Sequence, residues 1–175
     1  MRLFVGLQPS DEFRTALSGL QGRLREAGVT GRYLDPSNLH MTLAFIGEWP
    51  EEDAPVLPEV ERPFSVTLSR PGVFPEAKVL WAGVAPSDAL DNLAENVRSR
   101  LAESGIPFDP KPFRAHITLA RKPFVPAGVI LSDIAVPPVS MTVREVCLYR
   151  SARGENGMEY TVIGRSAGKG GKNGE

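Results

Sequence analysis

The feature of the sequence that most constrains its fold is an internal repeat. Residues 3–11, LFVGLQPSD, match residues 80–88, LWAGVAPSD, at five of nine positions. In the same order, HMTLA at residues 40–44 matches HITLA at residues 116–120, and the interval between the copies is nearly the same. Coincidence is a poor explanation for two matched segments that keep their order and their spacing. We therefore expect two related lobes of about 80 residues each.

Each copy of the repeat is expected to form a strand, a helix and a second strand. Residues 9–12 open the first helix and Gly28 ends it, while Ser87 caps the second helix and Gly105 ends it. Apolar residues recur at helical spacing in both helices. The strands of the two copies are expected, in chain order, at residues 2–7, 39–46, 79–84 and 114–120.

Outside the repeat, β-branched and alternating segments predict further antiparallel strands. These strands are expected at residues 64–68, 139–143, 146–150 and 160–164, with a hairpin loop at residues 153–157. The repeated parts, about residues 3–47 and 80–121, would then belong to one domain of two interleaved lobes over residues 1–165. Residues 166–175 hold no apolar residue beyond one Ala, so we expect a flexible tail there.

Charge and composition exclude several classes of protein. The chain has 20 Lys and Arg against 21 Asp and Glu, a net charge of −1, without the basic excess that long nucleic acids usually require. Any nucleic-acid contact is therefore expected in a local pocket for an end. No apolar run approaches the roughly 20 residues of a membrane span, and the N-terminus lacks the features of a signal peptide. The single cysteine, Cys147, cannot form an internal disulfide, so the expected compartment is a reducing cytoplasm.

The chain contains two histidines, and each begins one of the repeated H-[MI]-T-L-A pentapeptides. Because side chains alternate along a strand, His40 shares a face with Thr42, and His116 shares one with Thr118. A pseudo-twofold relation would bring these four side chains to one groove. One neutral imidazole can then accept a proton while a protonated one donates, and each hydroxyl can bind an oxygen of the bound group. A lone histidine on a strand is more often structural, but its duplication favours a functional pair.

A cation just beyond the second motif is expected to bind phosphate. The planar guanidinium of Arg121 suits a phosphate, but regular alternation from His116 puts Lys122 on the groove face instead. Arg121 reaches the groove if the strand ends or bulges there, and Pro123 is consistent with an end. Lys122 is the alternative cation, and a surface ion pair is the non-functional interpretation of Arg121.

Three aromatic residues, Phe4, Trp81 and Tyr149, are candidates for stacking on a base, although aromatic residues in repeated strands more often belong to the core.

The sequence does not contain the residues that other common active sites require. Neither a phosphate-binding glycine loop nor a G-x-S-x-G elbow occurs, and two histidines with a distant Cys147 do not supply a zinc site. Cys147 lies within an apolar strand, which is typical of core packing. We therefore expect neither a metal nor a cofactor.

With these motifs the chain resembles the two-histidine phosphoesterase superfamily, and within it the RNA 2′,3′-cyclic phosphodiesterases, also called bacterial-type 2′-5′ RNA ligases. The resemblance covers nearly the whole chain. It includes the opening RLFVGL, the segments NLHMTLAFIGE and PFRAHITLAR, and the late LYRS. One departure is Ala115, where family members often carry Pro, and this change removes no chemical group.

The resemblance implies an α+β fold of two lobes related by a pseudo-twofold duplication, with an antiparallel sheet and helices in each lobe. The active groove would lie between the lobes. It also implies that His40 donates a proton to the leaving 3′ oxygen and that His116 accepts one from the attacking water. Thr42 and Thr118 would hold the phosphoryl oxygens, and Arg121 would stabilise their charge.

The implied reaction is metal-independent hydrolysis of RNA 2′,3′-cyclic phosphate ends to 2′-phosphomonoesters, by a monomer acting on RNA ends or short oligonucleotides. Two alternatives stay open. Ligation of a cyclic phosphate to a 5′-hydroxyl end through a 2′-5′ bond uses the same groups in reverse. A non-catalytic protein that binds RNA ends would be served as well by Arg or Lys as by two histidines. A hydrolysis assay distinguishes the three.

Overall fold

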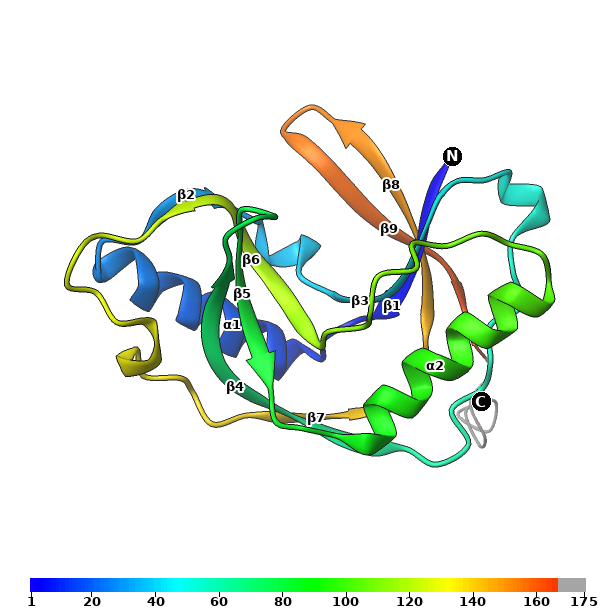
Figure 1. The fold of residues 1–175 in the computed structure, drawn as a ribbon, viewed down its shortest axis with the longest axis horizontal. Helices are drawn as coiled ribbons and strands as arrows, with labels where there is room; N and C mark the ends of the chain where they lie inside the picture. Colours follow the sequence, from blue (N-terminus) through cyan, green and yellow to red (C-terminus); the bar gives the residue numbers. More distant parts are fainter. Residues whose placement is uncertain (167–175) are drawn as a thin grey trace.

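The computed structural model describes residues 1–166, which form two antiparallel sheets, each packed against one long helix (Figure 1). The first sheet has four strands, in the order β3 (Met41–Glu48), β1 (Arg2–Leu7), β8 (Cys147–Gly154) and β9 (Gly157–Arg165). The second has five, in the order β2 (Thr30–Tyr33), β6 (His116–Phe124), β5 (Val79–Val84), β4 (Phe64–Phe74) and β7 (Ser140–Val143). Three short 3₁₀ turns lie in the connections, at Pro36–Asn38, Glu51–Asp53 and Leu131–Asp133. The expected α+β class is confirmed.

The repeat appears as two strand-helix-strand units, β1-α1-β3 and β5-α2-β6, with α1 at Asp11–Glu26 and α2 at Asp88–Glu103. Both helices begin where the sequence predicts. The hydroxyl of Ser10 accepts a hydrogen bond from the Phe13 N–H at 3.2 Å, and that of Ser87 accepts one from the Leu90 N–H at 3.1 Å. These side chains satisfy amide groups that have no partner within the helix.

Each helix packs against the sheet that contains the other copy of the repeat. The Gln21 side chain of α1 bonds the Leu119 carbonyl in β6, and the Arg98 side chain of α2 bonds the Leu43 carbonyl in β3. Figure 1 shows α1 beside β5 and β6, and α2 along the other side of the molecule. An apolar helix stripe needs an apolar sheet face, and the short loops after β1 and β5 lead each helix to the opposite sheet. The two copies of the repeat therefore exchange their helices.

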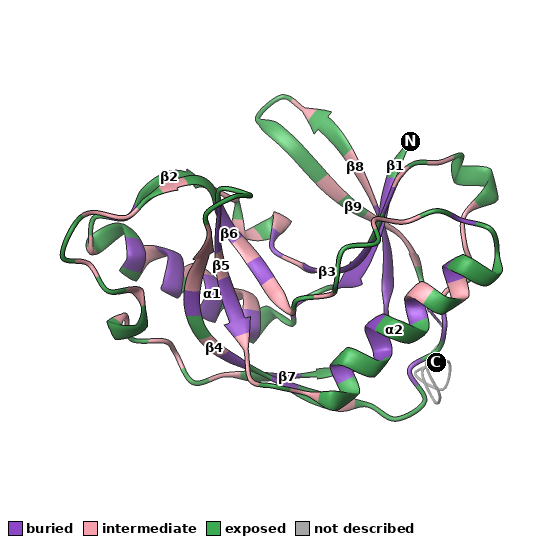
Figure 2. Ribbon diagram, viewed as in Figure 1, coloured by how far each residue is buried: buried purple, intermediate pink, exposed green. Residues whose placement is uncertain are grey.

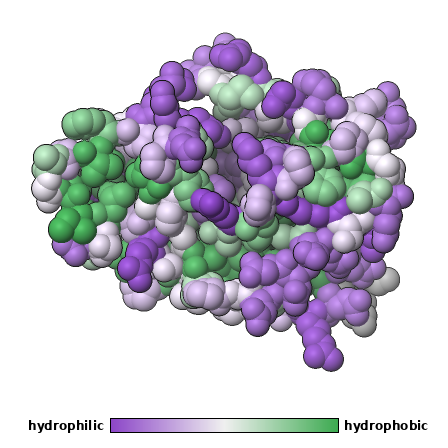
Figure 3. Space-filling model, in the orientation of Figure 1, coloured by the Kyte–Doolittle hydropathy of each residue, from purple (hydrophilic) through white to green (hydrophobic). Residues whose placement is uncertain are grey.

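Buried apolar side chains from both helices and both sheets form one continuous core (Figure 2). A second, smaller group of buried residues comprises Phe4, Cys147 and Tyr149, on the face of the first sheet. Hydrophobic side chains also gather at the left end of the face that Figure 3 shows. Phe124 and Ile130 are among the large hydrophobic residues that are exposed. Across residues 1–166, neither long helix is apolar enough to cross a membrane.

Several boundaries differ from the sequence predictions. The expected hairpin loop at residues 153–157 is shorter, because β8 runs to Gly154 and β9 begins at Gly157, and β6 runs on to Phe124 instead of ending at residue 120. Strand β2 was not expected, because its four residues are largely exposed and show no apolar alternation. Strand β4 runs on to Phe74 because Pro71 pairs with Ala82 within the sheet. At the other end, Ser166 is buried, and its amide and hydroxyl both bond the backbone of Val146. Ser166 therefore does not belong to a flexible tail, and the rest of the expected tail, residues 167–175, lies outside the described part of the chain.

Candidate active site

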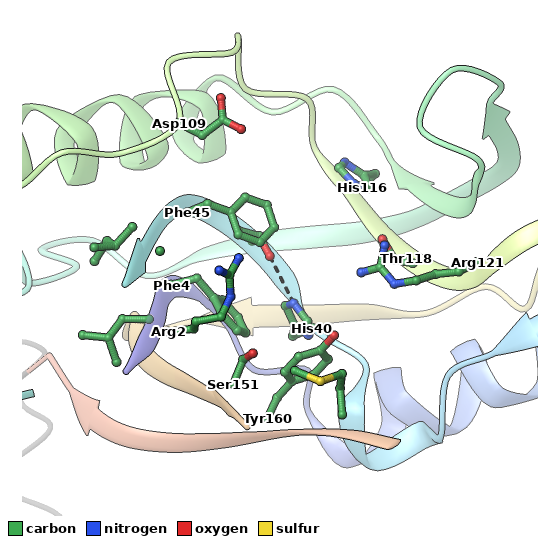
Figure 4. A pocket seen from close by; sticks show the side chains of 15 residues that line it. Arg2, Phe4, His40, Phe45, Asp109, His116, Thr118, Arg121, Ser151 and Tyr160 are labelled. Carbon is green, nitrogen blue, oxygen red and sulfur yellow. Dashed lines mark hydrogen bonds between the residues drawn. The ribbon is translucent and has the colours of Figure 1, made fainter. Parts of the chain in front are cut away.

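Both histidine motifs line one cavity of about 720 Å³ between the two sheets. His40 and Thr42 reach it from the first sheet, and His116, Thr118 and Arg121 reach it from the second (Figure 4). The structure thus brings together the five side chains that the sequence analysis assigns to catalysis and phosphate binding. Two strands that are distant in the sequence meet here because each belongs to a different sheet of the pseudo-symmetric pair.

The two imidazole rings are held in the same way. Nδ1 of His40 lies 2.7 Å from the Asn38 carbonyl oxygen, and Nδ1 of His116 lies 2.7 Å from the Arg114 carbonyl oxygen. A carbonyl can only accept a hydrogen bond, so both Nδ1 atoms carry the proton. Nε2 is then the atom that exchanges protons in both rings. In His40 this atom lies 3.1 Å from the Thr42 hydroxyl.

Burial shapes the acidity of both rings. It lowers the pKa of His40 from 6.5 to about 4, because water no longer solvates the imidazolium, and the nearby charges of Arg121 and His116 act in the same direction. Burial, together with the charge of Arg114, also lowers the pKa of His116. The carbonyl bonds at Nδ1 oppose these shifts in both rings. Both histidines are therefore neutral in the free protein at pH 7.

A β-bulge decides which cation faces the cavity. In the pairing of β5 with β6, Leu80 lies opposite Ala120 and Trp81 lies opposite Thr118, which leaves Leu119 as the extra residue. The extra residue reverses the alternation beyond it, so that Arg121 shares the face of Thr118. A bulge was one of the two features expected to turn Arg121 toward the groove, the other being an end of the strand. Both side chains are exposed, but Arg121 lines the cavity, whereas Lys122, which has a φ of 51°, is absent from the lining.

The first motif has the same bulge. Val5 lies opposite Ala44 and Gly6 lies opposite Thr42, so Leu43 is the extra residue of β3. A Cβ atom on Gly6 would lie 2.5 Å from the Met41 carbonyl oxygen, so a glycine is needed where the bulge brings the strands together. Beyond Leu43 the alternation reverses again. The side chain that shares the face of Thr42 is Phe45, which is 52% exposed and lines the cavity.

The aromatic residues predicted to stack on a base do not offer free ring faces. Phe4 and Tyr149 are each 4% exposed and stack on each other, with centroids 4.8 Å apart and an angle of 6°. The His40 ring packs on Phe4 at 4.7 Å, so protein covers Phe4 on both sides. These two rings therefore support His40. Phe4 also lines the cavity, and the stacking of either ring on a base stays a prediction.

Trp81, the third aromatic candidate, does not line the cavity. Its indole lies over Gly72, where a Cβ atom would come within 2.3 Å of the ring, and it packs on Phe74 at 5.1 Å. Phe74 in turn meets the His116 ring edge to face at 5.0 Å. Trp81 therefore supports His116 indirectly, because it packs on Phe74, which contacts the His116 ring.

Sequence reasoning missed five polar or aromatic residues that complete the cavity, labelled in Figure 4: Arg2, Phe45, Asp109, Ser151 and Tyr160. Tyr160 meets His40 edge to face at 4.9 Å. One signal for Phe45 was available, because Phe45 follows His40 at the same distance in the sequence as Arg121 follows His116. The other four lie outside the two histidine motifs, so no comparison between the two copies of the motif could identify them.

Within the described residues, Cys147 does not form a reactive thiol site and the acidic residues do not form a metal site. Burial raises the pKa of the Cys147 thiol to about 11, so it is protonated and unreactive near neutral pH. Within residues 1–166, no three side chains of His, Cys, Asp or Glu gather closely enough to hold a metal ion.

Comparisons with known proteins agree with this geometry. The family described as the 2′-5′ RNA ligase superfamily matches residues 9–155. An RNA 2′,3′-cyclic phosphodiesterase of Thermus thermophilus is 34% identical, covering 93% of this chain and 88% of that protein. Another from Thermotoga maritima is 29% identical, covering 93% of both. The crystal structure of Escherichia coli LigT complexed with 3′-AMP has a TM-score of 0.72 and 30% identity, covering 94% of this chain and 95% of that one.

Proposed function

This chain belongs to the 2′-5′ RNA ligase superfamily, and from that premise we propose that it hydrolyses RNA 2′,3′-cyclic phosphate ends to 2′-phosphomonoesters. One observation supports the proposal above the others. Two pseudo-equivalent histidines have the same tautomer and turn Nε2 toward one cavity that also holds two threonines and an arginine. Such a pair can supply a base and an acid to the same displacement.

The reaction follows from these groups. Nε2 of His116 takes a proton from a water molecule, and the hydroxide oxygen forms a bond to phosphorus. The bond from phosphorus to the 3′ oxygen breaks, and Nε2 of His40 gives its proton to that oxygen. The products are a 2′-phosphomonoester and a free 3′-hydroxyl. The Thr42 and Thr118 hydroxyls donate to the non-bridging oxygens, and Arg121 offsets the charge that develops there.

The lowered pKa values fit the two roles differently. His116 is neutral in the free protein, so it is ready to act as a base. His40 must hold a proton, and its burial opposes this. The negative charge of the bound phosphodiester favours an imidazolium beside it, so the proton is held in the substrate complex. Tight contact between phosphate and His40 is therefore part of the proposed mechanism.

The rest of the substrate has a place in the same cavity. Phe45 presents an exposed ring on the face of Thr42, which suits stacking by a nucleoside next to the phosphate. Arg2 lies along the same lobe and offers a charge to a neighbouring phosphate. Because one chain provides both motifs, a monomer of the single two-lobed domain is sufficient for the reaction.

The experiment is a hydrolysis assay of the purified protein on adenosine 2′,3′-cyclic phosphate and on a short RNA with a 2′,3′-cyclic end. The expected product is the 2′-phosphomonoester, separated from the 3′ isomer by chromatography. The His40→Ala/His116→Ala double variant is the control for contaminating activity. A 3′-phosphate product, or equal turnover by the double variant, would refute the proposal. Addition of a 5′-hydroxyl RNA to the same assay measures ligation.

A further inference from the structure

The extra residues of the two bulges, Leu43 and Leu119, have an unusual pair of partners. The Leu119 carbonyl accepts a hydrogen bond from Nε2 of Gln21 at 3.0 Å, and the Leu43 carbonyl accepts one from Nε of Arg98 at 3.1 Å. Both donors come from the helix of the opposite copy of the repeat. A bulge interrupts the pairing of its strand at the extra residue, so a donor from a helix can help to hold that residue in place. The Leu119 carbonyl also accepts a hydrogen bond from the Leu34 N–H at 2.9 Å, so Gln21 adds to a backbone contact there.

The two donors are equivalent in the pseudo-symmetry. The interval from Gln21 to Arg98 equals the interval between the first matched segments of the repeat, residues 3–11 and 80–88. Each donor also bonds a second carbonyl: Gln21 that of Leu34 at 3.0 Å, and Arg98 that of Lys111 at 2.7 Å. These second partners are separated by the same interval again. In each half one side chain thus bonds two equivalent carbonyls, although the side chain differs, which indicates a shared task for the two positions.

The environment of Gln21 shows that its contact is specific. Gln21 is 1% exposed, one of two buried polar residues among those described, the other being Ser166. Its amide nitrogen has two hydrogens, and the two carbonyls use both of them. A polar group is buried at this depth only at a cost, which its hydrogen bonds offset.

We infer that Gln21 and Arg98 are positioning residues, which hold the two bulges so that Arg121 and Phe45 face the cavity. Gln21 acts on Arg121 through Leu119, which lies two residues before it. Arg98 acts on Phe45 through Leu43 in the same way. The inference rests on the proposed function in one respect, that Arg121 contacts the phosphate and Phe45 the nucleoside.

The test is a pair of double-variant cycles measured on adenosine 2′,3′-cyclic phosphate. Gln21→Met removes both hydrogen bonds and keeps the volume. We expect kcat/KM to fall roughly tenfold, the equivalent of the one bond, to the Leu119 carbonyl, that holds the bulge. In an Arg121→Ala background the same change is expected to cost less than about twofold, because the side chain it positions is gone. Arg98→Met is expected to raise KM roughly fivefold with little change in kcat, and to have no such effect in a Phe45→Ala background.

Two controls separate positioning from general stability. The first crosses the pairs: Gln21→Met is expected to keep its full effect in the Phe45→Ala background, and Arg98→Met its own in the Arg121→Ala background. The second is Arg98→Gln, which restores an amide donor like the one in the other half and is expected to recover most of the wild-type KM. Equal losses in all backgrounds, with no recovery by Arg98→Gln, would overturn the inference.

Two complications are covered by the same set of variants. Should Gln21→Met fail to fold, the half-exposed Arg98 and its exposed partner Phe45 carry the test alone. Should the wild-type protein hydrolyse no cyclic phosphate, the proposed function fails. The cycle of Gln21→Met with Arg121→Ala is then measured as affinity for inorganic phosphate by titration calorimetry. Coupling between the two variants would support the inference, and additive losses would overturn it.

Discussion

Burial of His40 makes the stability of the protein depend on pH in a predictable way. The unfolded chain binds a proton at this imidazole near pH 6.5, whereas the folded protein binds it near pH 4. Between these values the unfolded state holds more protons, so the free energy of unfolding falls as the pH falls. The gap of about 2.5 pH units corresponds to about 3 kcal/mol in total, of which about 2 kcal/mol is lost by pH 5.

The measurement is urea denaturation of the wild type and of His40→Gln at pH 7.5, 6, 5 and 4.5. The variant has no imidazole to protonate, so its free energy of unfolding should fall less steeply than that of the wild type. The difference between the two is expected to change by about 2 kcal/mol between pH 7.5 and pH 5. Carboxyl groups with lowered pKa values, such as that of Asp35, act at lower pH and are common to both proteins.

Two further measurements test whether the burial of histidine causes the pH dependence of the free energy of unfolding. His116 is the only other histidine, so His116→Gln should flatten the curve in the same direction. Inorganic phosphate should reduce the loss in the wild type, because an anion in the cavity favours the imidazolium. Parallel pH curves for the wild type and His40→Gln would mean that His40 titrates as it does in water. The reasoning from its burial would then be wrong.

Other predictions concern catalysis. Replacement of His40 or His116 by Ala should lower kcat/KM by roughly 10²- to 10⁴-fold, and the double variant should be little worse than either one; multiplied losses would contradict a shared mechanism. Because both pKa values are lowered, the bell-shaped profile of kcat/KM, which reports the free protein, should peak below pH 6.5, and a maximum near pH 8 would contradict it. Arg121→Ala should cost roughly 10²-fold while the matched control Lys122→Ala costs almost nothing, and equal losses would show that the bulge does not select the cation. Turnover should persist in excess chelator, and loss that a single divalent ion restores would show a different reaction class.

Local chemistry made parts of this fold predictable. Ser10 and Ser87 cap their helices because a hydroxyl at that position satisfies nearby amides whatever the tertiary structure. The histidine pair was predictable because the repeat marks both residues and strand alternation pairs each with its threonine. These inferences need no knowledge of which strand lies beside which.

Features that depend on which strands and helices pack together could not be predicted from the sequence. A bulge is defined by the pairing with a neighbouring strand. The sequence therefore showed that Arg121 would face the groove only if the strand bulged or ended, but it could not show whether it does. The sheet that each helix covers was not predicted, because an apolar stripe shows that a helix packs on a sheet but does not show on which one. The burial of Phe4 and Tyr149 agrees with their place in apolar strands, but their stacking across β1 and β8 could not be predicted, because these strands are far apart in the sequence.

The exchange of the helices also bears on how this architecture arises. A single copy of the strand-helix-strand unit has its helix over a sheet that it does not contain, so one copy alone leaves an apolar face uncovered. Two separate copies would cover each other's faces and place one histidine each at their junction. The present chain has the arrangement of such an intertwined homodimer joined by a linker. Cleavage of the chain in the β4–β5 turn, at residues 75–78, should therefore give two fragments that do not fold separately. When mixed, they should fold together and form the complete cavity.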